Sequence, residues 1–152
     1  MNLVQRTVRD LLKKYRTSDP YLLADYLGVH VLYVDNDELD EGFTAVYVPA
    51  ERPVIVLNNK FEHSKERYFY MAHELYHAIN HTDIVAFYHG GYNVKGKLER
   101  EANIFATYLC LVGVIARNGQ SSIDVLRENY IPLEMEEYIY GKVFKPKSSK
   151  TL

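Results

Sequence analysis

Two histidines and a glutamate lie close together in the middle of the chain, within His73-Glu74-Leu75-Tyr76-His77. Residues four apart on an α-helix project from nearly the same face, about 40° apart, so a helix lets both imidazoles bind one metal ion. Residues 70–72 and 78–79 on either side are apolar, which predicts that this helix is largely buried. Because buried polar side chains are costly without partners, the fold must supply partners to this helix.

This HExxH spacing predicts a zinc site with His73 and His77 as ligands. Glu74 lies beside them on the helix, too far round to bind the ion, where it can take a proton from a metal-bound water. The chain has only six histidines in 152 residues, so a chance HExxH would occur in roughly one or two chains in a hundred of this composition. The motif therefore predicts a metallopeptidase with Zn²⁺ as cofactor and Glu74 as catalytic base.

A zinc site of this kind needs a third protein ligand, and two candidates lie just after the motif. His81 follows His77 by one helical turn, where it is more simply a helix-end residue that faces the helix dipole. Asp83 follows His73 by ten residues, which is the spacing of metzincin-type enzymes. Those enzymes need a glycine for a sharp turn at the position of Ile79, so we discount Asp83.

The third candidate is Glu99, at the start of the next predicted helix. Asn103 lies four residues further along, on the same face, where it can hydrogen-bond a zinc-bound histidine. We expect Glu99 to bind zinc and Asn103 to support it, while Glu101 faces elsewhere as a solvated or helix-start carboxylate. Tyr88 and His89, between the two helices, are candidate donors to an oxyanion.

The remaining periodicity predicts a small, mostly helical α+β domain with a three-stranded sheet beside the HExxH helix. Asp19 followed by Pro20 marks a helix start, and Gly28 marks its end. A loop over residues 82–96 separates the two long helices. We expect one domain over residues 1–144 and a disordered basic tail over 145–152. The expected helices lie at about 4–15, 20–28, 62–80, 97–116, 122–129 and 133–140, and the strands at 29–34, 43–48 and 54–57, the last two as a hairpin.

Charge and hydropathy exclude several classes of protein. The formal net charge is −2, whereas a nucleic-acid-binding protein usually has a basic face. Residues 22–29 resemble the first helix of a helix-turn-helix, but a strand-like segment follows where the recognition helix would be. The longest uncharged stretch, residues 102–115, falls short of the roughly 20 apolar residues of a membrane span. We expect a cytoplasmic protein without direct nucleic-acid or membrane binding.

Segments on either side of HExxH make the pattern more specific. Downstream lies Glu99-Arg100-Glu101-Ala102-Asn103-Ile104-Phe105-Ala106, and upstream lie Val54-Ile55-Val56-Leu57-Asn58 and Arg67-Tyr68-Phe69-Tyr70-Met71-Ala72. This combination resembles the ImmA/IrrE family of small metallopeptidases, which joins HExxH to a downstream ExxANxFA-like segment. The resemblance covers about residues 20–115.

The resemblance implies a gluzincin-like fold in which two histidines and one glutamate hold zinc. Members of that family are often encoded by phages and integrative elements beside a repressor, which they cleave or inactivate as antirepressors. It therefore implies a phage or mobile-element transcriptional repressor as partner, in the cytoplasm of a bacterial host. The sequence departs from the family at Tyr76, where Gly or Ala is usual, and at residues 109–113, where Leu-Leu-Met-Pro is common. Neither departure affects a proposed ligand, and both bear on substrate preference.

A second class of function is a zinc-containing regulatory module that inactivates a repressor by docking, without efficient proteolysis. Glu74 is not needed to hold the metal, and structural zinc sites more often use cysteines, which favours the enzyme. If the protein is a peptidase, residues 43–48 are the candidate sheet edge for an extended substrate, because the segment alternates and ends at Pro49. An ordinary core strand explains that segment equally well.

Overall fold

The computed structural model describes residues 2–35, 44–80 and 91–139. Helix α1, Leu3–Tyr15, begins with a capping box in which the Asn2 side chain accepts from the Gln5 backbone and the Gln5 side chain accepts from the Asn2 backbone. It buries Val4, Val8 and Leu11 and leaves its charged residues outside. The expected amphipathic helix is therefore confirmed.

Helix α2, Pro20–Tyr26, also follows the sequence prediction. The Asp19 side chain accepts a hydrogen bond from the backbone of Tyr21 at 2.9 Å, and Pro20 occupies the first helical position. Gly28 ends the segment with φ +74°, a conformation that costs glycine little. A strand follows directly, so the described structure contains no recognition helix at this place and no helix-turn-helix.

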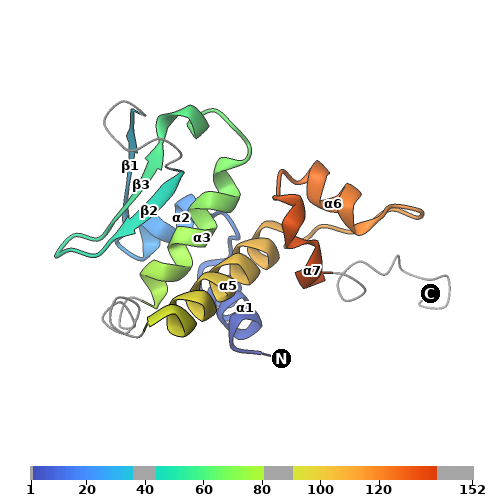
Figure 1. Cartoon of the computed structure of the whole chain (residues 1–152), viewed down its shortest axis with the longest axis horizontal. Coiled ribbons are helices and arrows are strands. Elements are labelled where there is room, and N and C mark those ends of the chain that lie inside the picture. The colour runs from blue at the N-terminus through green and yellow to red at the C-terminus, as the bar shows by residue number, and fades with distance from the viewer. Residues whose placement is uncertain (1, 36–43, 81–90, 140–152) are drawn as a thin grey trace.

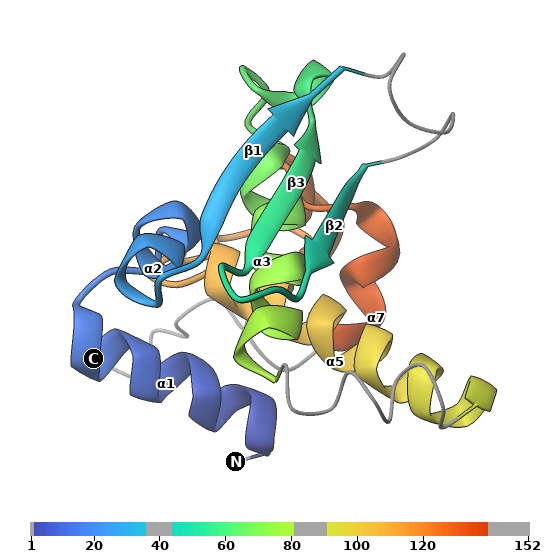
Figure 2. The same ribbon diagram turned by 90° about the vertical axis from the view of Figure 1, so that its left-hand side faces the viewer.

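The sheet has the strand order β1-β3-β2, with β3 in the middle, as Figure 2 shows. Strand β1, His30–Val34, runs parallel to β3, Val54–Asn58, with Leu32 opposite Val56. Strand β2, Ala45–Val48, runs antiparallel to β3, with Val46 opposite Val56. The predicted three strands and the hairpin are confirmed, and β2 forms an edge of the sheet.

The two faces of the sheet differ in their surroundings. Ile55 and Leu57 of β3 are fully buried on the face that packs against the helices. On the other face, Leu32, Val46 and Val48 are exposed. In Figure 2 this second face is turned towards the viewer, and α3 lies behind the sheet. Side-chain alternation with a period of two therefore places β2 directly beside the HExxH helix.

Helices α3, Arg67–Ile79, and α5, Gly91–Cys110, pack along each other and carry the two motif segments (Figure 1). The expected start of the first helix near residue 62 is wrong. The Asn58 side chain instead caps a 3₁₀ turn, η2, at Asn59–Phe61, and turns around Ser64 follow, so that α3 begins five residues later.

The expected bounds of the second long helix, 97–116, are also wrong. Gly91 and Gly96 lie inside α5 rather than in a loop, because their helix penalty of about 1 kcal/mol each is small beside the packing of the whole helix. The helix ends at Cys110, before Gly113 with φ +80°. Asn118-Gly119 therefore lies in a turn well beyond the helix and does not end it.

The C-terminal part forms a small group of helices beside the end of α5. It consists of α6, Ser122–Glu128, the 3₁₀ turn η4, Leu133–Met135, and α7, Glu136–Ile139. The sequence prediction placed two short helices here, and the structure confirms them with a 3₁₀ turn at the start of the second. Val125, Leu126, Ile131 and Ile139 join the common hydrophobic core, so this part packs on the rest of the chain.

The structure as a whole confirms the α+β class, with mainly helices and one small mixed sheet. Residues 81–90 and 140–152 lie outside the described residues, and with them His81, Asp83, Tyr88, His89 and the predicted tail 145–152. A single domain over residues 1–144 remains a prediction. Of the described helices, none is both long and apolar enough to cross a membrane.

Candidate metal centre

The site is built from two helices that meet side by side. His73 and His77 lie one turn apart on α3, and Glu99 lies on α5. One Glu99 oxygen, Oε2, is 3.2 Å from His73 Nε2, and the other, Oε1, is 2.9 Å from His77 Nε2. The ligand atoms of these three residues lie within 4.8 Å of one another. The structure thus brings together the three residues that the sequence analysis selected.

The chemistry of this donor set fits zinc. In a tetrahedral site with bonds of about 2.1 Å, ligand atoms are about 3.4 Å apart. Both separations between Glu99 and the histidines are slightly shorter than that, and small side-chain rotations suffice to bring all three atoms around one ion. Two imidazole nitrogens and a carboxylate oxygen are ligands that zinc accepts, and they leave a fourth position for water. The residues are compatible with a metal site.

Electrostatics couple the three side chains closely. Hydrogen bonds from His73 and His77 hold the pKa of the Glu99 carboxyl well below its usual range. Burial lowers the pKa of His73, but hydrogen bonding to Glu99 and Asn103 and the charges of Glu74 and Glu99 outweigh it, so the pKa is raised overall. A metal ion that binds here must therefore compete with protons for these side chains.

Asn103 lies four residues after Glu99 on α5, and its side chain hydrogen-bonds His73. Since the Nε2 atom of His73 faces Glu99, this amide is in a place to fix the orientation of the imidazole. Such a contact restricts the ring to the rotamer that points into the site. This position of the Asn103 side chain next to His73 is the one that its spacing of four residues from Glu99 predicts.

Glu74 is held from an unexpected direction, the edge of the sheet. The backbone N–H of Tyr47 in β2 donates to Glu74 Oε2 at 2.8 Å, while Oε1 lies 3.9 Å from His73 Nε2. Its side chain is only 12% exposed, and burial raises the pKa of the carboxyl despite the opposing effects of the histidines and of the Tyr47 N–H. One oxygen is therefore anchored, and the other faces the metal site as a stronger base than an exposed glutamate.

Glu101 corrects the sequence analysis in one respect. It points away from the three ligand residues, as expected, but it is not a solvated carboxylate. Its Oε2 accepts a 2.6 Å hydrogen bond from the hydroxyl of Tyr76, and its side chain is 20% exposed. Tyr76, the residue that departs from the family pattern, is buried between α3 and α5. This hydrogen bond links α3 and α5 beside the site. Tyr76, where the family usually has Gly or Ala, was the one sequence feature that indicated it.

A cleft with a volume of 380 Å³ opens beside Glu74 and His73. One wall comes from the start of β2, with Thr44 and Ala45, and another from α3. The remaining wall comes from the C-terminal part of the chain, which the sequence analysis did not connect with the site because it carries no motif. The cleft is lined by Thr44, Ala45, Phe69, Tyr70, His73, Glu74, Asn103, Pro132, Glu134 and Met135.

Comparison with known proteins places the chain in a family. The sequence model of peptidase family M78, described as an IrrE N-terminal-like domain, matches residues 24–115. The chain is 30% identical over 139 residues to an uncharacterized immunity region protein of Bacillus phage phi105, which covers 88% of this chain and 86% of the phage protein. No solved structure matches. The matched region contains both helices of the candidate metal centre.

Proposed function

Because the chain belongs to the IrrE N-terminal-like peptidase family, we propose that it is a zinc-dependent peptidase. The observation that carries this proposal is the arrangement of His73, His77 and Glu99 around one point, with Glu74 anchored beside them. In this proposal the three residues hold zinc, Asn103 orients His73, and Glu74 is the catalytic base. Tyr88 and His89 remain candidate oxyanion donors.

Zinc in such a site polarises a peptide carbonyl and lowers the pKa of a bound water towards about 7. Glu74 is placed to accept the proton of that water at Oε1, because Oε2 is occupied by the Tyr47 N–H. Burial raises the pKa of this carboxyl, which makes it a stronger base than an exposed glutamate. After attack, the same oxygen can pass its proton to the leaving amine, and no covalent intermediate on the protein is required.

The open edge of β2 offers backbone groups with which an extended substrate can pair. Asn58 N–H donates to the Thr44 carbonyl, so Thr44, Val46 and Val48 direct their backbone groups towards β3. Ala45 and Tyr47 therefore direct theirs away from β3, towards the open edge beside Glu74. Because the Tyr47 N–H already donates to Glu74, a peptide would pair with the backbone of Ala45 and with the Tyr47 carbonyl, which would place its backbone next to the metal site.

The substrate that we propose is a phage or mobile-element transcriptional repressor, which the protein cleaves or inactivates in the cytoplasm of a bacterial host. The similarity to an immunity region protein of a phage supports this substrate class. We propose no direct contact with nucleic acid or membrane. The formal net charge of −2 agrees with a protein rather than a nucleic acid as the partner.

The decisive experiment compares the zinc-loaded protein with its Glu74→Gln variant on the transcriptional repressor that we propose as the substrate. Glutamine keeps the size of the side chain but cannot accept the proton, so cleavage is expected to fall at least about a hundredfold while zinc content is retained. Equal cleavage by both proteins would remove Glu74 from the mechanism. Binding of the repressor without any cleavage by the wild type would instead identify a zinc-containing docking module.

A further inference from the structure

The cleft beside Glu74 is completed by residues that lie beyond the part of the chain matched by the family model. The family match ends at residue 115, whereas Pro132, Glu134 and Met135 line the cleft. These residues belong to η4 and the position before it, and they share the cleft with Ala45 at the start of the edge strand. The C-terminal part of this chain thus contributes a wall of its own to the candidate active site.

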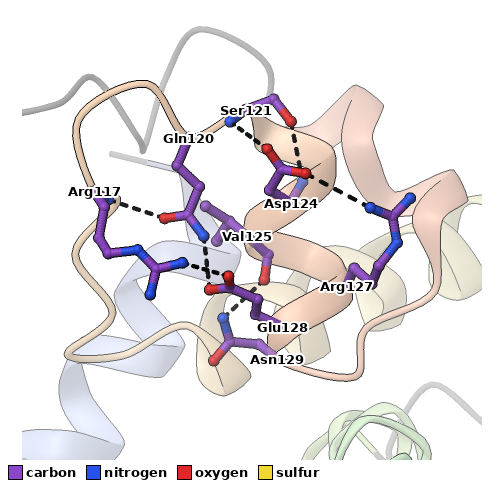
Figure 3. A network of polar contacts seen from close by, with 8 residues as sticks. All are labelled: Arg117, Gln120, Ser121, Asp124, Val125, Arg127, Glu128 and Asn129. Carbon is purple, nitrogen blue, oxygen red and sulfur yellow. Dashed lines mark hydrogen bonds and ion pairs between the residues drawn. The ribbon is translucent and has the colours of Figure 1, made fainter.

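A network of polar contacts surrounds α6, the helix that precedes this wall in the chain, as Figure 3 shows. Ser121 and Asp124 form a capping box, and the Glu128 carboxylate accepts from both Arg117 and Gln120. Beyond α6, the backbone of Ile131 donates to the Leu126 carbonyl at 3.0 Å. Ile131 and Met135 are both buried. The turn η4 is therefore held against the core through Met135, while the Glu134 side chain is exposed.

The cleft combines apolar walls with an acidic end. Phe69 and Met135 are buried, and Tyr70 is half-buried beside them. Burial raises the pKa of the Tyr70 hydroxyl, and the charges of Glu66 and Glu134 raise it further. Among the described residues that line the cleft there is no lysine or arginine.

Two carboxylates line this cleft, and they are held differently. Glu74 is anchored by the Tyr47 N–H, whereas Glu134 is exposed and makes no ion pair with any cation in the described part of the chain. A volume of 380 Å³ lies at the lower end of the range for ligand sites, about 300–1,000 Å³. The cleft therefore suits one long side chain with an apolar stem and a cationic end.

We propose that this cleft binds an arginine or lysine side chain of the substrate next to the bond that is cut, with its charged end at Glu134. The aliphatic stem packs against Phe69 and Met135, and the charge is neutralised by the carboxylate at the rim. An acidic side chain is rejected, because it would meet both Glu134 and Glu74. This inference rests on the proposed peptidase function and names the residue class that the site selects.

The test is peptide binding to the zinc-loaded Glu74→Gln variant, which cannot consume its ligand. The probes are fluorescein-labelled alanine-based octapeptides that differ at one central position, which is Arg, Leu or Glu. We expect the Arg peptide to bind at least about tenfold more tightly than the Glu peptide. Adding Glu134→Gln should weaken Arg-peptide binding about fivefold, the scale of one partly exposed ion pair, and leave the Leu peptide unchanged.

The matched control is Glu51→Gln in the same background. Glu51 is exposed in the turn after β2, at the opposite end of that strand from Ala45, and the change alters the net charge equally. The control should bind the Arg peptide as the parent does. The inference is overturned if Arg and Leu peptides bind equally, if no peptide binds measurably, or if Glu51→Gln weakens binding as much as Glu134→Gln.

Digestion of reduced casein by the zinc-loaded wild type separates this inference from the proposed function. If the wild type cuts next to basic residues and Glu134→Gln loses that preference, both the peptidase function and the basic-side-chain site are supported. Cutting without preference for basic residues overturns the inference and leaves the peptidase function in place. If the wild type cuts neither casein nor the proposed repressor while the Glu74→Gln variant still prefers the Arg peptide, the peptidase function is wrong and the basic-side-chain site stands.

Discussion

Replacing Glu99 by glutamine, and Glu101 by glutamine as its control, tests the third ligand most directly. Both changes remove one negative charge from α5, two residues apart, but only Glu99 faces the histidines. We expect Glu99→Gln to lose zinc, because an amide oxygen is a much poorer zinc ligand than a carboxylate. Glu101→Gln should keep about one zinc per chain.

The magnitude follows from ligand linkage. Zinc at a free concentration of 100 times its dissociation constant stabilises the folded state by about 2.7 kcal/mol. For a chain of 152 residues, each kcal/mol raises Tm by about 2–4 °C. The wild type and Glu101→Gln should therefore melt about 5–10 °C higher with zinc than with a chelator. Glu99→Gln should show almost no difference between the two conditions.

The metal-free proteins supply the necessary baseline. The Glu99 side chain is 42% exposed, so its replacement should change the stability of the metal-free protein little. Glu101→Gln weakens a charge-assisted bond from Tyr76 and should cost about 1 kcal/mol with or without zinc. Circular dichroism melting with and without zinc, together with metal content by atomic absorption, measures all three proteins. A zinc response that survives Glu99→Gln and disappears in Glu101→Gln would refute the assignment of the third ligand.

Three further predictions concern proton linkage, packing and the sheet edge. The pKa of His73 is raised in the metal-free site, and zinc must displace the proton that His73 binds. Zinc affinity should therefore weaken as pH falls through that pKa, by up to about tenfold for each pH unit below it. Competition titrations that give the same zinc affinity from pH 8 to pH 5 would contradict this prediction. Tyr76→Phe removes the hydroxyl that donates to Glu101 and should lower the free energy of unfolding of the metal-free protein by about 1–3 kcal/mol, measured by urea titration. A decrease below about 0.5 kcal/mol would show that this hydrogen bond contributes little to stability. Ala45→Pro removes an N–H that points to the open edge of β2, so it should weaken cleavage while zinc stays bound. Val46→Pro instead removes an N–H of the β2–β3 ladder and should destabilise the sheet itself. Cleavage at the wild-type rate by a folded, zinc-loaded Ala45→Pro variant would exclude this edge as the docking strand.

Short-range patterns in the sequence were sufficient for those parts of the protein whose geometry is local. The i, i+4 spacing of His73 and His77 determines that both imidazoles leave one face of α3, whatever surrounds the helix. Asp19 and Pro20 define a helix start because a cap acts through its own backbone neighbours. The turn over residues 49–53 between two strand-like segments predicted the hairpin of β2 and β3 for the same reason.

Helix ends were less predictable, because they depend on competition between local turns and packing. The Asn58 cap and the turn at Ser64 delay the start of α3, whereas α5 begins at Gly91 and continues through Gly96 despite the low helix propensity of glycine. Helix propensity differs by only about 1 kcal/mol per residue, so tertiary contacts decide such boundaries. The choice of Glu99 over His81 and Asp83 followed from the lack of a glycine at Ile79 and from the shared face of Glu99 and Asn103, and the family resemblance implied the same ligand.

Contacts between distant segments were decided only by the tertiary structure. The Tyr47 N–H that anchors Glu74 comes from a residue 27 positions away, and a backbone donor leaves no trace in the identity of its side chain. The partnership of Tyr76 with Glu101 joins two helices across 25 positions. Glu134 reaches the cleft only because α6 and η4 pack against the end of α5. Sequence patterns report which face of an element a residue occupies, whereas the partner of that face depends on how the elements pack.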